Sequence, residues 1–328
     1  MSRELTKYDI HGHIVIPEFK DFLEDAGGIT PKGNTIDGTP VPNWDLDVQW
    51  ELMAQLGIKW ALLTHSSPAP YCGDIDKCKN IVRLFNERAA EYKRDYPERL
   101  GYAAVLPLPD VEAACEEAII NLDSMGANGV KLGTNIAGQY LGDPALNPLF
   151  EELDKRSTLI ILHPHLSEPL NTTTWTAKFG PGFEFVCDTT RAVINMIMNG
   201  VFERYKNIKV VVPHCSSFLS WQYDKFLVAG EFSYRNGIID EPVDVKSAYD
   251  RLYFDTAGMN VEDQVRFMLK ICAAPSHILY GSDTAYTPPP VNERTMSRLE
   301  AAFESDPELA PYKDMIFAEN CKRLVGLD

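Results

Sequence analysis

The sequence is short of basic residues and has no long apolar run. Its 31 Lys and Arg against 47 Asp and Glu give a net charge of −16, which opposes binding to the phosphate backbone of nucleic acid and to anionic membrane surfaces. No run reaches the roughly 18 apolar residues of a membrane span, and the first residues carry no signal-peptide core. We therefore expect a cytoplasmic protein with neither nucleic acid nor a membrane as a partner.

Several sequence motifs are also missing. The seven cysteines are odd in number and are never spaced as CxxC, which is typical of free thiols in a reducing compartment and excludes a zinc ribbon. No GxGxxG follows an apolar run, which counts against an open dinucleotide-binding sheet. Because the sequence shows neither internal repeats nor a sharp linker, we expect a single domain over residues 1–328.

What the sequence does have is a series of short apolar runs, most of them followed by a stretch of helical periodicity. Segments such as 111–127 and 147–156 place apolar residues at helical spacing with charges on the other face. The apolar runs cover residues 7–13, 60–66, 101–107, 129–134, 158–164, 209–215, 252–257 and 277–283. Runs that are apolar on both faces predict a covered parallel sheet, and eight such units predict a closed (β/α)₈ TIM barrel.

The segment of residues 17–48, after the first run, is rich in Gly and Pro and too long for an ordinary loop between a strand and a helix. Long connections of this kind usually form lids or small subdomains. We expect the barrel to carry an insertion here that covers the site or contacts a second subunit.

Polar side chains gather at the C-terminal ends of the apolar runs, which in a barrel share one rim where active sites are built. They are His11, His13, His65, Lys131, His163, His165, His214, Asp255 and Asp283. Only one histidine, His277, opens a run instead, so we expect it to be structural and to lie at the opposite rim.

A pair of these histidines is spaced for binding an ion. His11 and His13 are two residues apart on a predicted strand, so both side chains point to the same face and can offer two nitrogens to one ion. His163 and Asp283 would complete a set of imidazole and carboxylate ligands suited to a divalent ion that keeps an open coordination position.

Four motifs together resemble the amidohydrolase superfamily over nearly the whole chain: DIHGH at 9–13, LHPH at 162–165, VPHC at 212–215 and YGSD at 280–283. Within it, the chain resembles the mononuclear decarboxylase branch, which contains aminocarboxymuconate-semialdehyde, γ-resorcylate and 6-methylsalicylate decarboxylases. The segments 140–156 and 183–193 look most like the 6-methylsalicylate subgroup.

This resemblance implies one divalent metal ion, Zn²⁺ or Mn²⁺, held by His11, His13, His163 and Asp283. It also implies that His214 is the catalytic histidine and that the protein is a homodimer or a larger homo-oligomer.

The sequence departs from the family pattern at three positions. Resorcylate-type decarboxylases carry a Glu three residues and an Arg eleven residues after the sixth-strand histidine, where this chain has Ser217 and Lys225. Lys131 lies near the place of the lysine that bridges two metals in binuclear amidohydrolases. The roles of Lys131 and Lys225, and with them the exact substrate, stay open.

The chemistry of these residues leads to two alternatives. A divalent ion with an open position can hold a carboxylate and a neighbouring phenol oxygen, so that one ring carbon lies against a proton donor, Asp283, which His214 recharges before CO₂ leaves. The same residues could instead use a metal-activated water to hydrolyse a lactone or amide or to hydrate an alkene. We predict a metal-dependent decarboxylase of a small aromatic or enol carboxylic acid, with the hydrolase or hydratase as the alternative.

Further side chains could contact that substrate. Arg191 could bind its carboxylate or pair with Asp188. Trp175 and Tyr286, with neighbouring aromatic residues, could wall an arene pocket or pack in the core. His65 could line the pocket or cap a turn. A barrel that has lost catalysis and only binds a partner is disfavoured, because such a protein has no reason to keep the whole ligand set.

Overall fold

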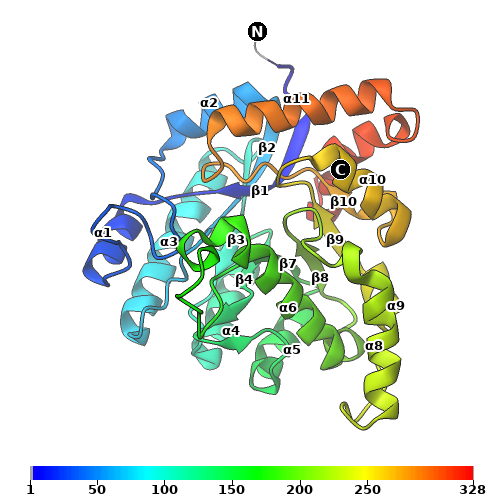
Figure 1. Ribbon diagram of the computed structural model, residues 1–328. Coiled ribbons are helices and arrows are strands. Elements are labelled where there is room, and N and C mark those ends of the chain that lie inside the picture. Colours follow the sequence, from blue (N-terminus) through cyan, green and yellow to red (C-terminus); the bar gives the residue numbers. More distant parts are fainter. Residues whose placement is uncertain (1–2, 328) are drawn as a thin grey trace.

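Eight parallel strands form the centre of the computed structural model, which describes residues 3–327 (Figure 1). They pair in the order β1-β2-β3-β4-β7-β8-β9-β10. Their bounds are β1 Lys7–His13, β2 Ile58–Thr64, β3 Leu100–Val105, β4 Gly129–Gly133, β7 Leu159–His163, β8 Lys209–Val212, β9 Leu252–Asp255 and β10 Ile278–Leu279. Each of the eight predicted runs overlaps one of these strands, so the prediction of a (β/α)₈ TIM barrel is confirmed.

The barrel closes between its first strand and the segment that follows its last one. The backbone N–H of Ile10 donates to Tyr280 O at 3.0 Å, and that of Asp283 donates to His11 O at 2.8 Å. The buried carboxylate of Asp9 adds a bond from the backbone N–H of Ser282 at 3.0 Å. Because these contacts join the two edges, a regular eighth strand of only two residues is sufficient for closure.

The helices surround the strands (Figure 1). They are α1 Pro17–Asp25, α2 Leu46–Leu56, α3 Ile75–Asp95, α4 Val111–Ile120, α5 Asn147–Lys155, α6 Glu184–Met198, α7 Val201–Arg204, α8 Tyr223–Arg235, α9 Val245–Asp250, α10 Val261–Ile271, α11 Pro289–Ser305 and α12 Asn320–Val325. A hairpin of β5 Asn135–Ile136 and β6 Gln139–Tyr140 follows β4. Shorter helical turns occur at Asn121–Met125, Pro144–Leu146, Thr176–Lys178, Gly180–Gly182, Ser220–Gln222, Pro275–His277, Ala310–Tyr312 and Met315–Glu319.

Local sequence explains where the helices begin and which face they bury. The side chains of Asp45, Asp74 and Asp110 cap α2, α3 and α4 by accepting backbone N–H bonds, which satisfies donors that have no partner within a helix. The helices predicted at 111–127 and 147–156 are present as α4, extended by a π-helical turn, and as α5. Their buried apolar faces pack on the strands, and the largest apolar cluster lies between the two layers.

The insertion of residues 17–48 contains α1 and the start of α2, with short bridges from Ile29 to Thr35 and from Asn34 to Pro40. It contacts two segments that leave the C-terminal ends of strands. The ring of Phe19 lies 4.5 Å from that of His65, just after β2, and the carbonyl of Asp37 accepts a 2.8 Å bond from Gly180 N–H, in the segment after β7. The insertion therefore lies at the rim where the site was predicted.

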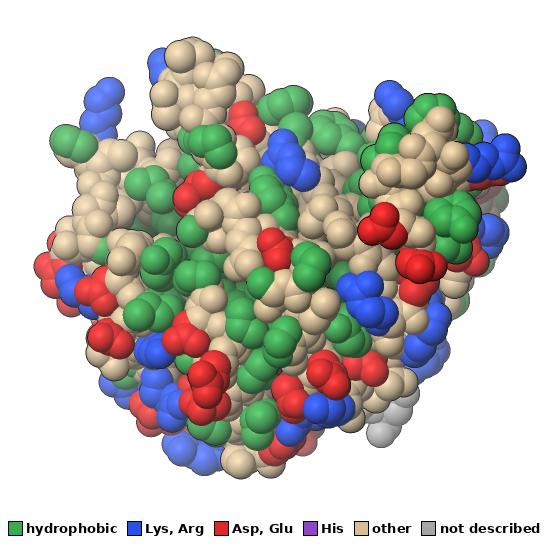
Figure 2. Space-filling view, turned by 90° about the horizontal axis from the view of Figure 1, so that it is seen from below, with side chains coloured by type: hydrophobic (Ala, Val, Ile, Leu, Met, Phe, Trp, Pro, Cys, Tyr) green, Lys and Arg blue, Asp and Glu red, His purple; other side chains and the backbone are tan. Residues whose placement is uncertain are grey.

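The outer surface carries charges of both signs. Figure 2 shows acidic, basic and apolar side chains interspersed over one face of the molecule, with no histidine visible there. Within residues 3–327, no helix is both long enough and apolar enough to cross a bilayer. All seven cysteines are free thiols, as their spacing predicts.

Candidate metal centre

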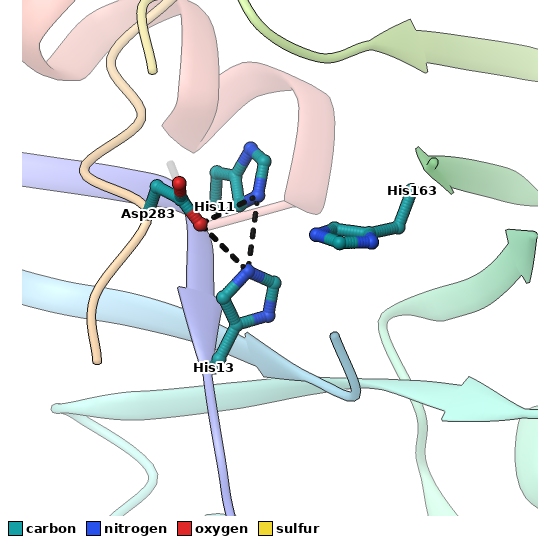
Figure 3. A group of neighbouring side chains, drawn as sticks. All are labelled: His11, His13, His163 and Asp283. Carbon is teal, nitrogen blue, oxygen red and sulfur yellow. Dashed lines mark hydrogen bonds and ion pairs between the residues drawn. The ribbon is translucent and has the colours of Figure 1, made fainter. Parts of the chain in front are cut away.

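Four side chains converge at the C-terminal rim of the barrel: His11, His13, His163 and Asp283. Each offers one ligand atom, and these atoms all lie within 4.8 Å of one another. Nε2 of His13 is 3.1 Å from Nε2 of His11 and 3.0 Å from Oδ1 of Asp283. Figure 3 shows the side chains of His11, His13 and Asp283 close together and the ring of His163 facing them from the other side.

The barrel geometry explains this convergence. His11 and His13 alternate with Gly12 along β1, so both rings point to the same face. Gly12 turns to the other face, where an added Cβ would meet atoms of the neighbouring β2 at 3.4 Å. His163 is the last residue of β7, and Asp283 follows β10 in a left-handed conformation with φ of 57°. The ends of parallel barrel strands share a rim, which places these residues together.

The hydrogen bonds of the imidazoles fit a cation between them. Nδ1 of His11 lies 2.7 Å from the carboxylate of Asp255, and Nδ1 of His13 lies 3.3 Å from the carbonyl of Thr64. Nδ1 of His163 also faces a backbone carbonyl, at 3.0 Å. Because these oxygens only accept, each Nδ1 carries the hydrogen and each Nε2 directs a lone pair inward. Lone pairs held this close repel one another unless a cation lies between them.

The electrostatics of the site keep its carboxylate ionised. Burial alone would raise the pKa of Asp283, but the polar contact with His13 and the charge of His11 hold it well below its usual value. Burial lowers the pKa of His13 and His163. The pKa of His11 is raised to about 9, because the negative charges of Asp255 and Asp283 outweigh burial. In the absence of a metal, His11 is the imidazole that holds a proton most strongly.

His214 is directed toward this centre by an unusual turn after β8. Residues 214–217 all have positive φ, between 49° and 68°, a conformation that costs non-glycine residues about 1–2 kcal/mol each. The backbone N–H of His214 donates to Oδ1 of Asp255 at 2.9 Å, which holds the start of the turn. The His214 ring lies 5.3 Å from that of His11, with Nε2 4.0 Å from Oδ2 of Asp283. His214 therefore lies beside the ligand group without belonging to it.

Two of the predicted substrate contacts lie near this centre. The ring of Tyr286 packs edge-on against His13 at 5.5 Å. His65 is buried, with its ring 4.5 Å from Phe19 and 5.5 Å from Phe85, and within residues 3–327 neither of its nitrogens has a hydrogen-bond partner. Both roles that the sequence left open for His65, a contact with substrate and a cap of the turn after β2, stay predictions.

The two other predicted contacts lie at more exposed positions. Arg191 donates to Asp188 Oδ1 at 2.7 Å and to the hydroxyl of Tyr140 at 2.8 Å, which is the ion pair that the sequence left open as the alternative. Trp175 is 66% exposed and its ring lies 6.3 Å from that of Phe179. Roles of Arg191 and Trp175 in substrate binding remain predictions.

Several contacts of the site were not predicted. Asp255 stood among the rim residues, but its bonds to His11 and His214 were not foreseen. Ser66 Oγ lies 3.2 Å from His163 Nε2. Phe185 lies in α6, with its ring 6.2 Å from that of His163. The order of residues along the chain holds no signal for these contacts, except that an aspartate lies near the end of the run at 252–257.

A cavity of about 490 Å³ opens next to His214. Its other lining residues are Val186, Ser217, Phe218, Trp221, Asn260, Asp263, Gln264 and Phe267. Such a mixture of aromatic walls and a few polar groups is suited to a small aromatic ligand.

Comparisons with known proteins agree with this geometry. A model of the amidohydrolase family matches residues 8–327. The 6-methylsalicylic acid decarboxylase of Penicillium expansum is 28% identical over 305 residues, with 90% of each chain covered. The gamma-resorcylate decarboxylase of Rhodococcus jostii is 24% identical over 302 residues, covering 84% of this chain and 87% of the relative.

Solved structures show the same fold. A crystal structure described as amidohydrolase II is 32% identical with a TM-score of 0.88, covering 98% of this chain and 99% of that one. The 5-carboxyvanillate decarboxylase of Novosphingobium aromaticivorans, determined as a mutant with bound manganese, is 17% identical with a TM-score of 0.85, covering 98% of this chain and 97% of that one.

Proposed function

Because the chain belongs to the amidohydrolase family, whose model spans nearly its whole length, we propose that it is a metal-dependent carboxy-lyase that removes CO₂ from a small aromatic carboxylic acid. The observation that carries this proposal is the convergence of three imidazole nitrogens and one carboxylate beside a further histidine, His214. The curated relatives reported above are named as decarboxylases. They favour this function over hydrolysis or hydration.

We propose that His11, His13, His163 and Asp283 hold one divalent ion, Zn²⁺ or Mn²⁺. The inward-facing nitrogens and the ionised carboxylate suit either ion, and the bound manganese of the carboxyvanillate decarboxylase supports Mn²⁺. When bound, the ion supplies positive charge that attracts the carboxylate and phenol oxygens of the substrate into a protein of net charge −16.

The side chains of the protein then deliver one proton to the substrate ring. The ring carbon that bears the carboxylate gains a hydrogen, its bond to the carboxylate carbon breaks, and the electron pair of that bond restores the aromatic ring as CO₂ leaves. We propose that Asp283 delivers the hydrogen, because its carboxyl group lies among the ligands that would hold the substrate. His214 Nε2, 4.0 Å from Asp283 Oδ2, is placed to supply the proton again.

Aromatic side chains near the ligands are suited to hold the substrate ring. Tyr286 packs on His13, and Phe185 on His163. Flat side chains on two sides fix an arene by its faces and edges. The insertion of residues 17–48, which lies at this rim, would act as a lid that keeps water away from the reacting carbon.

We also propose that the protein is a cytoplasmic homo-oligomer. Large apolar side chains are exposed at Phe183, Trp221, Val228 and Phe232. Exposed apolar groups of this size are typical of protein interfaces. Light scattering coupled to gel filtration would give the oligomeric state directly.

A substrate panel tests the reaction. The protein loaded with Mn²⁺ or Zn²⁺ is incubated with a set of ortho-hydroxybenzoates, and released CO₂ and the arene product are measured. A parallel set of lactones and esters serves as the comparison. Decarboxylation of at least one benzoate by metal-loaded but not by metal-free protein is expected. Turnover confined to the lactones or esters would instead establish the hydrolase.

A further inference from the structure

A second group of buried polar side chains lies close to the metal centre and has no part in the reaction described above. Lys131, in the middle of β4, is 3% exposed. Its Nζ donates to the carbonyl of Ser66 at 3.1 Å and to Nε2 of His165 at 2.9 Å. His165 can accept because its Nδ1 donates to the carbonyl of Asn135 at 2.9 Å. Burial lowers the pKa of Lys131 to about 7, and the charge of Asp37 opposes this fall. In its protonated form the group has three hydrogens, so one N–H of Lys131 remains available.

The insertion places a carboxylate opposite this lysine. Asp37 is 2% exposed, and its Oδ2 has no hydrogen-bond partner within residues 3–327. Burial raises the pKa of Asp37 to about 6, while a hydrogen bond from Ser67 and the charge of Lys131 oppose this rise. The bond from Gly180 N–H to the Asp37 carbonyl fixes the backbone at this point. The remaining N–H of Lys131 is therefore a buried donor, and Oδ2 of Asp37 is a buried acceptor.

One residue joins Lys131 to the ligand group. Ser66 accepts from Lys131 with its carbonyl, while its Oγ lies 3.2 Å from Nε2 of His163. The ammonium is thus separated from a proposed metal ligand by a single residue.

Tyr286 connects the insertion with the metal centre. Its ring packs on His13, and burial together with the negative charges of Asp37 and Asp283 raises its pKa. The tyrosine therefore lies under the influence of both the insertion carboxylate and the carboxylate of the metal centre. Asp37 and Lys131 accordingly belong to the surroundings of His13 and His163.

Building on the proposed function, we propose that Lys131 and Asp37 form a subsite for a second hydroxyl group on the ring of the aromatic acid. A hydroxyl accepts one hydrogen bond and donates another, which matches the free N–H of Lys131 and the free Oδ2 of Asp37. A methyl group at the same place would leave both buried groups without a partner. Sites built to hydrogen-bond a hydroxyl reject analogues that lack it far more strongly than apolar pockets reject a size change.

This subsite predicts which of two acids of similar size the protein prefers as its substrate. The chain should prefer 2,6-dihydroxybenzoate to 2-hydroxy-6-methylbenzoate, although two of its relatives are named for 6-methylsalicylic acid. We measure kcat, KM and calorimetric binding for both acids with the Mn²⁺-loaded wild type, K131M and D37N. The matched control is K59M, because Lys59 is exposed and lies at the start of β2, away from the rim.

For the wild type, kcat/KM should be about 100-fold higher with the dihydroxy acid. K131M and D37N should each reduce this preference by about 10-fold, mainly through the KM of the dihydroxy acid, and K59M should not change it. An equal loss for both acids in the variants, or a wild-type preference for the methyl acid, would overturn the subsite. D37N keeps the shape of the side chain and decides the question if K131M does not fold.

The binding titration keeps this inference separate from the proposed function. If neither acid releases CO₂, the decarboxylase proposal fails for these acids, but the calorimetry still compares the two ligands. About 10-fold tighter binding of the dihydroxy acid to the wild type, lost in D37N, supports the subsite. Equal binding of both acids by the wild type rejects it.

Discussion

The carboxylate of Asp255 joins His11 to His214. Its Oδ2 accepts a hydrogen bond from Nδ1 of His11 at 2.7 Å, and its Oδ1 accepts one from the backbone N–H of His214 at 2.9 Å. Asp255 is 1% exposed, so solvent offers neither group a replacement partner. A single buried side chain therefore orients a proposed metal ligand and the proposed acid–base histidine.

Replacing Asp255 by Asn should weaken both metal binding and turnover. The amide cannot accept at both positions with the strength of a carboxylate, so we expect a loss of about 10–100-fold in metal affinity or turnover. Metal titration by calorimetry and CO₂ release would measure these effects. Asp240→Asn, at an exposed position, is the matched control. Unchanged metal affinity and turnover in Asp255→Asn would show that Asp255 has no orienting role.

The proposed metal should stabilise the folded protein. An ion that binds only the folded chain adds about 2.7 kcal/mol to the free energy of unfolding at about 100 times its Kd. Urea unfolding with and without Mn²⁺ or Zn²⁺ measures this gain, which His163→Ala should reduce strongly. His277→Ala is the control, because His277 precedes β10 at the other rim and contacts the Leu252 carbonyl at 3.2 Å. A gain that survives in His163→Ala would remove His163 from the ligand set.

The stability of the metal-free protein should fall with pH in part because of His65. Burial and the charge of Lys131 lower the pKa of His65 well below 6.5. Below about pH 6.5 the unfolded chain binds a proton at His65 and the folded chain does not, so the free energy of unfolding decreases as the pH falls. His65 alone changes the free energy of unfolding by up to about 1.4 kcal/mol per pH unit.

His65→Leu removes that titration and should make the decline shallower between pH 6.5 and pH 5. Urea unfolding at both pH values, for the wild type and the variant, gives the two slopes. Identical slopes would mean that His65 is already protonated in the folded protein or finds a partner there.

His214→Asn should separate chemistry from metal binding. Asparagine adopts positive φ more readily than most residues, so the turn at residue 214, with φ of 59°, should persist. We expect turnover to fall by about 100-fold or more, with metal affinity unchanged because His214 lies outside the group of convergent donors. A parallel loss of metal affinity would contradict the role as a proton carrier and would indicate a ligand.

Some features of the structure were correctly predicted from local sequence patterns. The eight strands and helices α4 and α5 follow from the spacing of apolar residues, because side-chain direction alternates along a strand and repeats every three to four residues along a helix. The same rule explains why His11 and His13 share a face. The positions of His163 and Asp283 after apolar runs were enough to place them at the same rim.

Other features depend on contacts between residues that are distant in the sequence. Asp255 contacts His11 across 244 positions, and no periodic pattern relates the two. Asp37 belongs to an irregular insertion, where the lack of periodicity leaves side-chain direction undetermined. Asp188, the partner of Arg191 that the sequence offered, lies one turn away on α6, whereas Tyr140 of the β5–β6 hairpin becomes a partner only through tertiary packing.

The sequence by itself therefore determined the barrel and its candidate ligands, because both arise from short-range steric rules and from the shared direction of parallel strands. Only the tertiary structure decided which groups support those ligands and which buried donors and acceptors remain free. Those relationships depend on how loops, the insertion and distant strands pack together, and short-range rules do not constrain that packing.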